Sequence, residues 1–483
     1  MTASATLDWT SYNNTINGRA AKTATTRHGI NPATEEPLPE VPVATQDDVD
    51  AAVAAGRAAF PAWSRTSWDE REALVNKFMD VVEVNQAGFV DMVVKETGKA
   101  VSTAGMEFAS TIKFGRELAA LRVEDKVLVD SAEMTGTLRH VSLGVGAAIV
   151  PWNWPLLLAT IHLVSGLITG NCVIVKPSPF TPYANLKLVE VAASIFPPGV
   201  VQVLSGGDDL GPMLTEHPDI DKVSFTGSSF TGKKVMASCA RTLKRVTLEL
   251  GGNDVAIVCD DADLVKAVPA IATMAFLSSG QICMAVKRIY VHEKVYEPFK
   301  AALVDFAKAI KMGDPEDPTT LVGPIQNAMQ YGKVQELFSE IKKEGWNAIV
   351  GGDPDARAAQ PKGYYMHPTI IDNPPPDSRI VQEEPFGPIV PLLKWSDEED
   401  VLADANASKM GLGGSVWSED TERAVRLAKR LECGSAWVNS HFHLEPRVPF
   451  GGAKSSGLGR SLGTLGLEGW MEPQSLWVPK ASM

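Results

Sequence analysis

Between residues 146 and 250 the sequence alternates short apolar runs with segments of helical periodicity, and this alternation restricts the fold more than any other feature. Apolar runs separated by helices are typical of parallel strands that are covered on both faces. The first set of strands is predicted at 147–150, 172–176, 200–204, 222–225 and 246–250. A second set is predicted at 255–259, 288–292, 388–393, 414–417 and 435–438. We therefore expect an α/β protein with two parallel-sheet domains.

Two further segments have a different pattern. Residues 124–141 alternate like an antiparallel strand pair, and residues 471–479 are again extended. Helices that fill most of 45–121 precede them and carry no visible chemistry. We interpret those helices as packing layers.

The composition excludes several classes of protein. Of the 483 residues 45% are apolar and 21% are charged, which is typical of a globular chain, and the net charge of −13 argues against nucleic acid or an anionic membrane as a partner. The five cysteines are scattered without ligand spacing, so we expect no zinc site and a reducing compartment. No secretory signal or long apolar run is visible, and we therefore expect a cytoplasmic protein without a membrane span.

Polar residues and glycines follow the strands of the first set, at or just past the end of each strand. Asn153, Lys176, Gly227 and Glu249 are the clearest cases. Ligands of parallel sheets bind at the carboxyl ends of the strands, so these residues should share one edge.

Cys283 lies among small and flexible residues, which favours a nucleophile presented to a pocket, although a free cysteine is as often a core residue. Glu249 ends an apolar strand beside a diglycine, which indicates a general base with a raised pKa. The amide of Asn153 is a candidate oxyanion donor, or it satisfies its own loop.

The turn that begins at Gly227 follows a strand and opens a helix, as a phosphate-binding turn does. A plain strand–helix turn explains it about as well, and Lys176 could be a solvated strand end. His441 and His443 lack a third ligand, so no metal site is predicted.

Together these stretches resemble the aldehyde dehydrogenase superfamily over nearly the whole chain. The stretches that carry the resemblance are Pro151-Trp152-Asn153, Lys176-Pro177-Ser178, Phe225-Thr226-Gly227-Ser228, Leu248-Glu249-Leu250-Gly251-Gly252, Gly280-Gln281-x-Cys283, Glu384-x-Phe386-Gly387 and Pro449-Phe450-Gly451-Gly452-x-Lys454-x-Ser456-Gly457.

The resemblance implies a fold with three parts and an assembly of two or four subunits. The parts would be a Rossmann-type cofactor domain (1–123 and 142–251), an α/β catalytic domain (252–460) and a β oligomerisation arm (124–141 and 461–483). The protein would be a homodimer or a homotetramer.

The resemblance also assigns the chemistry. Cys283 would attack an aldehyde, Asn153 would hold the oxyanion, hydride would pass to the nicotinamide, and Glu249 would activate water to release the acid. The implied cofactor residues are Trp152, Lys176, Ser178, Gly227, Ser228, Leu250, Glu384 and Phe386.

The implied cofactor is NAD. Pro179 replaces a glutamate that binds the adenosine ribose in many NAD-preferring members, so NADP is also expected to be accepted. His162 stands where a lysine is common in the family, which affects the proton route near Glu249, and Ser461 stands where a glutamate is usual.

By the same resemblance an apolar set of side chains lines the substrate tunnel and predicts an uncharged aliphatic or aromatic aldehyde. These residues are Trp154, Leu158, Ile282, Met284, Leu444 and Phe450. Each is equally compatible with core packing, and Arg447 nearby would suit a carboxylated semialdehyde. The alternatives are a semialdehyde dehydrogenase, including a CoA-acylating one, and a catalytically silent nucleotide-binding scaffold.

Overall fold

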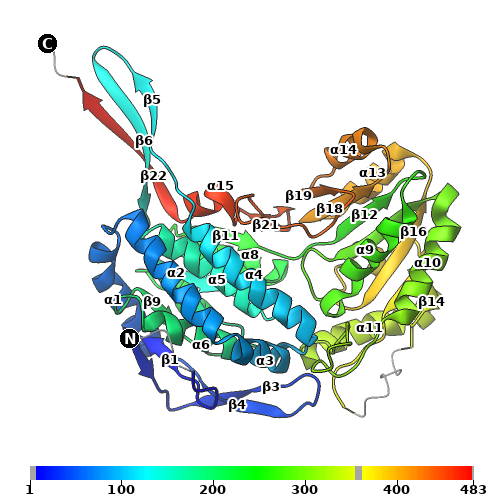
Figure 1. The fold of residues 1–483 in the computed structure, drawn as a ribbon, viewed down its shortest axis with the longest axis horizontal. Coiled ribbons are helices and arrows are strands. Elements are labelled where there is room, and N and C mark those ends of the chain that lie inside the picture. Colours follow the sequence, from blue (N-terminus) through cyan, green and yellow to red (C-terminus); the bar gives the residue numbers. More distant parts are fainter. Residues whose placement is uncertain (1–6, 354–361, 481–483) are drawn as a thin grey trace.

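The computed structural model describes residues 7–353 and 362–480. Figure 1 shows two α/β bodies side by side and a β arm that projects from one of them. Each body is built on its own sheet, and the chain passes between the two sheets after residue 249.

The first sheet has eight described strands in the order β2-β1-β9-β8-β7-β10-β11-β21. The five central strands are parallel, and β1 and β21 are antiparallel additions at the edges. The order turns round at β7, so the switch point of the sheet lies between β7 and β10. The bounds are β1 Asn14–Ile16, β2 Arg19–Ala21, β7 Val145–Ile149, β8 Cys172–Lys176, β9 Val201–Val203, β10 Lys222–Thr226, β11 Arg245–Glu249 and β21 Gly457–Leu458.

Helices cover both faces of this sheet, which explains why its strands are continuously apolar. Every residue of β7, β8 and β10 is buried. Capping boxes at Thr45 and Ser67 begin α1 and α2. The helices are α1 Gln46–Trp63, α2 Trp68–Val84, α3 Gln86–Thr97, α4 Val101–Ala119, α5 Pro155–Ile168, α6 Tyr183–Ala193, α7 Leu210–Glu216 and α8 Ser229–Ala240.

The second sheet has seven described strands in the order β14-β15-β16-β13-β12-β18-β19. All pairs are parallel except β14 with β15. The strands are β12 Asp254–Val258, β13 Val286–His292, β14 Asn347–Val350, β15 Thr369–Asp372, β16 Ile389–Trp395, β18 Gly413–Trp417 and β19 Ser435–Val438. The helices that follow or precede them are α9 Leu264–Phe276, η1 Leu277–Gly280, η2 Glu293–Val295, α10 Tyr296–Ala309, α11 Ala328–Glu344, α12 Arg379–Gln382, α13 Glu398–Asn406 and α14 Thr421–Ala428.

The projecting arm is a three-stranded antiparallel sheet of order β22-β6-β5. Its strands are β5 Lys126–Asp130, β6 Met134–Ser142 and β22 Met471–Pro479. Before β22 the chain forms β21 at the edge of the first sheet and then α15 Gly463–Glu468. Two small sheets complete the fold, from β3 Thr26–Ile30 with β4 Pro37–Pro42 and from β17 Met410–Gly411 with β20 Ala453–Lys454.

The expected α/β class with two parallel sheets and a β arm is confirmed. Strands expected at 172–176 and 435–438 have those bounds, and the remaining predicted strands differ by one or two residues at an end. The two outermost strands at one side of each sheet, β2 with β1 and β14 with β15, were not predicted, because three- or four-residue strands carry too few residues to show a period.

Candidate active site

The predicted site residues lie where an edge of one sheet meets an edge of the other. Asn153 and Glu249 follow or end strands of the first sheet, at its carboxyl edge. Cys283 and Glu384 precede β13 and β16, at the amino edge of the second sheet. The Asn153 side chain joins the two edges, because its Nδ2 donates to the carbonyl oxygen of Gln281 at 3.0 Å.

A strained backbone presents the nucleophile candidate. Ser278, Ser279 and Gly280 have consecutive positive φ angles of 54°, 58° and 69°. A Cβ on Gly280 would lie 2.3 Å from the carbonyl oxygen of Gly387. The side chain of Gln281 fixes the loop further, accepting from the backbone N–H of Gln326 at 2.9 Å. Such strain persists only where surrounding contacts hold it, and it is concentrated at functional sites.

The Cys283 thiol is in an unfavourable place for a thiolate. Burial raises its pKa to about 12, while the ammonium of Lys287 acts in the opposite direction. Glu384, Glu249 and Asp254 add negative charge nearby and raise the pKa further. The thiol is therefore protonated at neutral pH in this structure, and a base or a positive charge must favour its ionisation.

Glu249 is a buried carboxyl whose Oε1 has no hydrogen-bond partner among the described residues. Burial raises its pKa well above the ordinary value, and Arg460 lowers it only in part. The segment that follows Phe450 closes over it, since a Cβ on Gly451 would lie 2.8 Å from Glu249 Oε1. A buried carboxyl with a free oxygen suits a general base for water.

A buried ion pair that sequence reasoning missed holds the loop of Asn153. Lys99 Nζ lies 2.5 Å from Glu107 Oε2 and donates to the carbonyl oxygen of Asn153 at 2.7 Å. Glu107 Oε1 accepts from the N–H groups of Leu156 and Leu157 at the start of α5, at 2.8 and 3.2 Å. Both side chains are almost fully buried. The pair therefore fixes the turn between β7 and α5 from behind.

Lys176 lies at the carboxyl end of β8, as predicted. Burial lowers its pKa to about 8, and its Nζ makes one described hydrogen bond, to the carbonyl oxygen of Pro177 at 3.2 Å. An ammonium has three donors, so Lys176 keeps capacity for the hydroxyls or the phosphate of a nucleotide. Ser178 is buried beside it, and its hydroxyl accepts from the N–H of Phe180.

Gly227 connects β10 to α8 at the switch point of the first sheet. Its N–H donates to the carbonyl oxygen of Glu249 at 3.0 Å, which places the turn next to the base. Ser228 is the N-cap of α8 and accepts from the N–H of Thr231 at 3.2 Å. Leu250 is buried and donates its N–H to the carbonyl oxygen of Ser456. In this structure the Ser228 hydroxyl caps α8 by accepting from one of its first N–H groups.

Glu384 and Phe386 reach the site from the loop before β16. Glu384 Oε1 lies 2.8 Å from Lys287 Nζ and accepts from the N–H of Gly252 at 3.2 Å. The Phe386 ring meets the Trp152 ring edge to face, with centroids 5.3 Å apart. Both rings are half-buried, so they bring an aromatic wall from each sheet to the same place.

The six apolar residues predicted for the substrate tunnel belong to one hydrophobic cluster with Cys283. Three of them lie inside the core: Trp154, Ile282 and Met284 are 5%, 3% and 2% exposed. The three that remain partly exposed are Leu158, Leu444 and Phe450. Phe442, which the sequence did not single out, packs on Trp154 with ring centroids 6.0 Å apart.

Arg447, the candidate for recognising a carboxylate, is exposed and pairs with Glu445 at 3.2 Å. It is therefore a solvated ion pair rather than a buried anion receptor.

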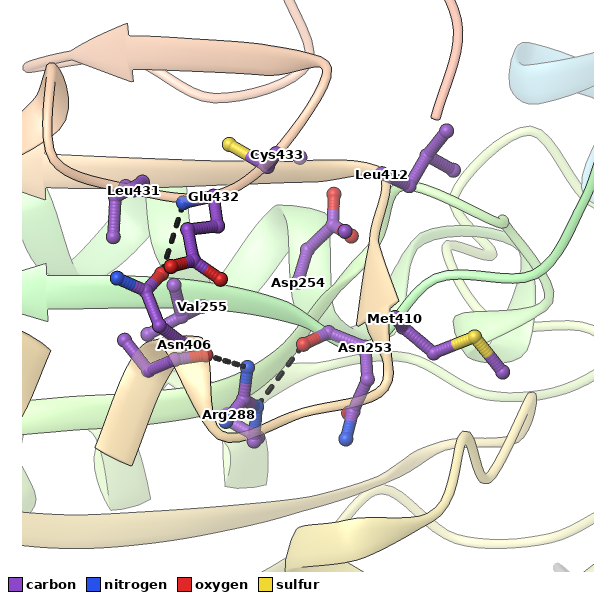
Figure 2. Close-up of a pocket in the computed structure, with 13 residues that line it drawn as sticks. Asn253, Asp254, Val255, Arg288, Asn406, Met410, Leu412, Leu431, Glu432 and Cys433 are labelled. Atoms are coloured by element: carbon purple, nitrogen blue, oxygen red, sulfur yellow. Dashed lines mark hydrogen bonds between the residues drawn. The ribbon is translucent and has the colours of Figure 1, made fainter. Parts of the chain in front are cut away.

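A small cavity lies behind the start of β12 (Figure 2), and it contains none of the predicted catalytic residues. Figure 2 shows Asp254 close to Leu412 and Cys433, and Arg288 with hydrogen bonds to backbone carbonyls. Arg288 donates to the carbonyl oxygens of Asn253 and Ala405, at 3.0 Å each. Arg288 thereby connects the residue before β12 to the end of α13.

His441 has a structural role, because both of its ring nitrogens contact other described residues of the protein. Its ring nitrogens contact the hydroxyl of Ser415 at 2.9 Å and the carbonyl oxygen of Met284 at 3.0 Å. Burial lowers its pKa to about 4. Among the described residues no group of three or more His, Cys, Asp or Glu could hold a metal ion. Nor do those residues contain a helix long and apolar enough to cross a membrane.

Comparison with known proteins identifies this arrangement. The profile of the aldehyde dehydrogenase family matches residues 19–476. The chain belongs to this family. A putative aldehyde dehydrogenase FUS7 of Gibberella fujikuroi is 39% identical over 98% of this chain and 100% of its own length. Retinaldehyde dehydrogenase 3 of Rattus norvegicus is 37% identical over 93% of this chain and 88% of its own.

Solved structures agree with the family assignment. The NAD⁺ complex of an aldehyde dehydrogenase from Bacillus cereus has a TM-score of 0.94 at 34% identity and covers 97% of this chain and 96% of that one. The protein is thus an NAD(P)-dependent aldehyde dehydrogenase that oxidises aldehydes.

The structure shows the contacts of two residues that depart from the family pattern, His162 and Ser461. The His162 ring lies between the hydroxyls of Ser224 and Thr226, at 2.9 Å from each, and burial lowers its pKa to about 4. It is therefore neutral at physiological pH. Ser461 pairs with Phe450 through both backbone hydrogen bonds, at 2.7 Å. Neither residue supplies a charge near Glu249.

Replacing Gly280 by alanine should disrupt the nucleophile loop, because the Cβ would collide with the Gly387 carbonyl and the φ of 69° disfavours a side chain. We expect a loss of about 1–3 kcal/mol in the free energy of unfolding and at least about a tenfold fall in kcat. Gly332→Ala in α11 is the matched control, since its Cβ meets nothing within 4 Å. Equal effects of the two substitutions in denaturant melts and initial rates would contradict this account.

Replacing Glu107 by alanine should leave the Lys99 ammonium buried without its carboxylate. The expected cost is about 3–5 kcal/mol of unfolding free energy, because an uncompensated buried charge is strongly destabilising. The control is Asp91→Ala in the exposed pair with Lys95, 2.8 Å apart, for which about 0–1 kcal/mol is expected. Urea unfolding of the two variants measures the difference, and a loss below about 1 kcal/mol for Glu107→Ala would show that the pair is not needed.

Proposed function

We propose that the protein is a hydrolytic aldehyde dehydrogenase in which Cys283 forms the covalent intermediate and Glu249 activates the water that releases the acid. The observation that carries this proposal is Glu249 itself, a buried carboxyl with a free oxygen at the edge that faces the Cys283 loop. A CoA-acylating enzyme would lose its thioester to water at such a base, so the hydrolytic reaction is favoured.

The residues of the first-sheet edge fit a nicotinamide nucleotide. Lys176 keeps unused donors, and the turn at Gly227 brings backbone to the start of α8, where an anion is stabilised. We assign the nucleotide to Trp152, Lys176, Ser178, Gly227, Ser228 and Leu250, with Glu384 and Phe386 from the other sheet. When bound, the nicotinamide supplies the hydride acceptor for the oxidation.

The chain's own residues then account for the remaining chemistry. The Cys283 thiol first releases its proton to solvent, and the thiolate sulfur then attacks the carbonyl carbon. The Asn153 amide, held beside the Cys283 loop by its contact with Gln281, donates to the oxyanion. After oxidation the acyl group is a thioester on Cys283. Glu249 takes a proton from water, the resulting hydroxide attacks the thioester, and the Cys283 sulfur leaves.

We propose an uncharged aliphatic or aromatic aldehyde as substrate. Of the six predicted tunnel residues, Leu158, Leu444 and Phe450 are the partly exposed ones, and they pack against the cluster that contains Cys283. Arg447 gives no support to a carboxylated substrate, because it is paired with Glu445 and its side chain is exposed to solvent. A panel of aldehydes would test the proposal, and a preference for carboxylated semialdehydes would overturn it.

Both NAD and NADP are proposed as cofactors, with Pro179 leaving no carboxylate at that position to repel a 2′-phosphate. The negative charges of Asp208 and Asp209 raise the pKa of Lys176 and thereby favour its charged form. Initial rates with each cofactor decide the preference, and complete inactivity with NADP would reject the dual use.

Assembly as a homodimer or homotetramer is proposed from the arm. Its two outer strands, β5 and β22, expose an apolar set that a monomer would leave in water: Val127, Leu128, Val129, Leu476, Trp477 and Val478. Sedimentation velocity measures the state, and a monomer at micromolar concentration would reject the proposal.

Cys283→Ala should abolish NAD(P)H formation, lowering kcat by at least about 10³-fold, because no other residue replaces the thiol. Glu249→Gln should retain a first burst of NAD(P)H but slow steady turnover by about 10²-fold or more, because only thioester hydrolysis needs the base. Stopped-flow absorbance at the NAD(P)H band separates the two.

Cys433→Ala removes a partly exposed thiol outside the proposed site and is the control, with rates expected within about twofold of the parent. Undiminished turnover by Cys283→Ala would overturn the mechanism. Formation of acyl-CoA when CoA is added would overturn the hydrolytic reading alone.

The rate should rise with pH. The Cys283 thiol and the Glu249 carboxyl are both acids whose pKa is raised by burial, so each is protonated and inactive below its pKa. Each gains its reactive charge only as the pH increases, and kcat/KM should therefore increase through the neutral range into the alkaline range. A pH–rate profile with its maximum at about pH 6 would contradict this assignment.

A further inference from the structure

Lys287 is a buried cation that the catalytic cycle described above does not use. It is the second residue of β13, four positions after Cys283, and its side chain is 3% exposed. Its Nζ donates to the carbonyl oxygen of Cys283 and lies 2.8 Å from Glu384 Oε1. The Phe386 ring centroid is 5.9 Å from the same nitrogen. A buried lysine is uncommon unless it is paired, and this one is paired within the site itself.

The partners of Lys287 link three parts of the site. Glu384, besides its contact with Lys287, accepts from the N–H of Gly252 at 3.2 Å. Gly251 and Gly252 leave room for this contact, because a Cβ on Gly251 would lie 2.2 Å from Glu384 Oε2 and one on Gly252 would lie 2.5 Å from the Cys283 carbonyl oxygen. The diglycine directly follows Glu249 and Leu250. One ammonium thus joins the nucleophile loop, the cofactor-facing carboxylate and the strand of the base.

The charges around Cys283 are otherwise unfavourable to a thiolate. Glu384, Glu249 and Asp254 approach it from the loop before β16, from β11 and from β12. His441, which contacts the neighbouring Met284 carbonyl, is neutral at physiological pH. Arg460 lies on the side of Glu249. Among the described groups that act on the Cys283 thiol, Lys287 is the only cation.

We propose that Lys287 is a positioning residue of this enzyme: its ammonium fixes the Cys283 backbone against Glu384 and supplies the positive charge that makes the Cys283 thiolate accessible. This proposal rests on the proposed function only in taking Cys283 as the nucleophile. A cation close to a buried thiol favours the ionised form, and its removal leaves carboxylates as the remaining charged neighbours.

The test is the pH dependence of Cys283 alkylation by iodoacetamide, followed by mass spectrometry of the peptide that contains Cys283, in the full-length enzyme without aldehyde. Lys287→Met should raise the apparent pKa of alkylation and slow the reaction at about pH 8 by at least about fivefold, since one close charge is lost. Lys287→Arg keeps the charge and should stay within about twofold of the parent. An unchanged profile for Lys287→Met, or an equal loss in Lys287→Arg, would overturn the proposal.

Two further variants keep the test decisive if Lys287→Met does not fold. Glu384→Gln removes a negative charge while Lys287 remains, and it should shift the alkylation profile to lower pH. Lys287→Met with Glu384→Gln removes both members of this ion pair, so that neither is left without the other, and should return towards the parental profile. A Glu384→Gln profile identical to that of the parent would overturn the electrostatic role. Alkylation reports the thiol and not aldehyde oxidation, so failure of the proposed function would show separately in the Cys283→Ala turnover.

Discussion

The hydrogen bond from the Asn153 amide to the Gln281 carbonyl joins the two sheets at the point where the chemistry takes place. Cys283, the proposed nucleophile, belongs to the amino edge of one sheet, and Asn153 and Glu249, the proposed oxyanion donor and base, belong to the carboxyl edge of the other. Neither edge alone holds all three groups. The proposed mechanism therefore depends on the packing between two α/β bodies, and the strained loop before Cys283 is held by contacts from both.

Much of this arrangement follows from local sequence. A parallel strand that is buried on both faces must be apolar, so the strands at 172–176 and 222–225 could be predicted, the second one residue short of β10. The position of Lys176 and Glu249 at one edge of the sheet could be predicted as well. Seven motifs taken together, not the stretch around Cys283 alone, indicated the family, and the match of its profile to residues 19–476 confirms that prediction. The role of Cys283 as nucleophile stays a proposal. The four-residue strands β14 and β15 were not predictable, because so few residues do not show a period.

The residues that the sequence did not reveal are the buried ions. Lys99 and Glu107 carry no motif, and their role arises only when α4 packs against α5 and brings the pair behind Asn153. Lys287 was missed as well, because the predicted strand begins at 288, and only the structure shows Lys287 inside a strand whose seven residues are all buried. A lysine inside such a strand requires a partner. The partner, Glu384, is nearly a hundred residues away along the chain, so the pair becomes visible only in the folded protein.

Burial explains why the proposed catalytic groups are neutral in this structure. It favours the neutral forms of the Cys283 thiol and the Glu249 carboxyl, raising the pKa of each, and it lowers the pKa of Lys176 to about 8. His162 and Ser461 bring no compensating charge. A neutral pair of acids avoids the repulsion that a thiolate beside a carboxylate would create. In the proposed mechanism the two charges are needed at different steps, first on the Cys283 sulfur and then on the Glu249 oxygen. One low-dielectric site can then supply both in turn, provided that a fixed cation makes the first of them accessible.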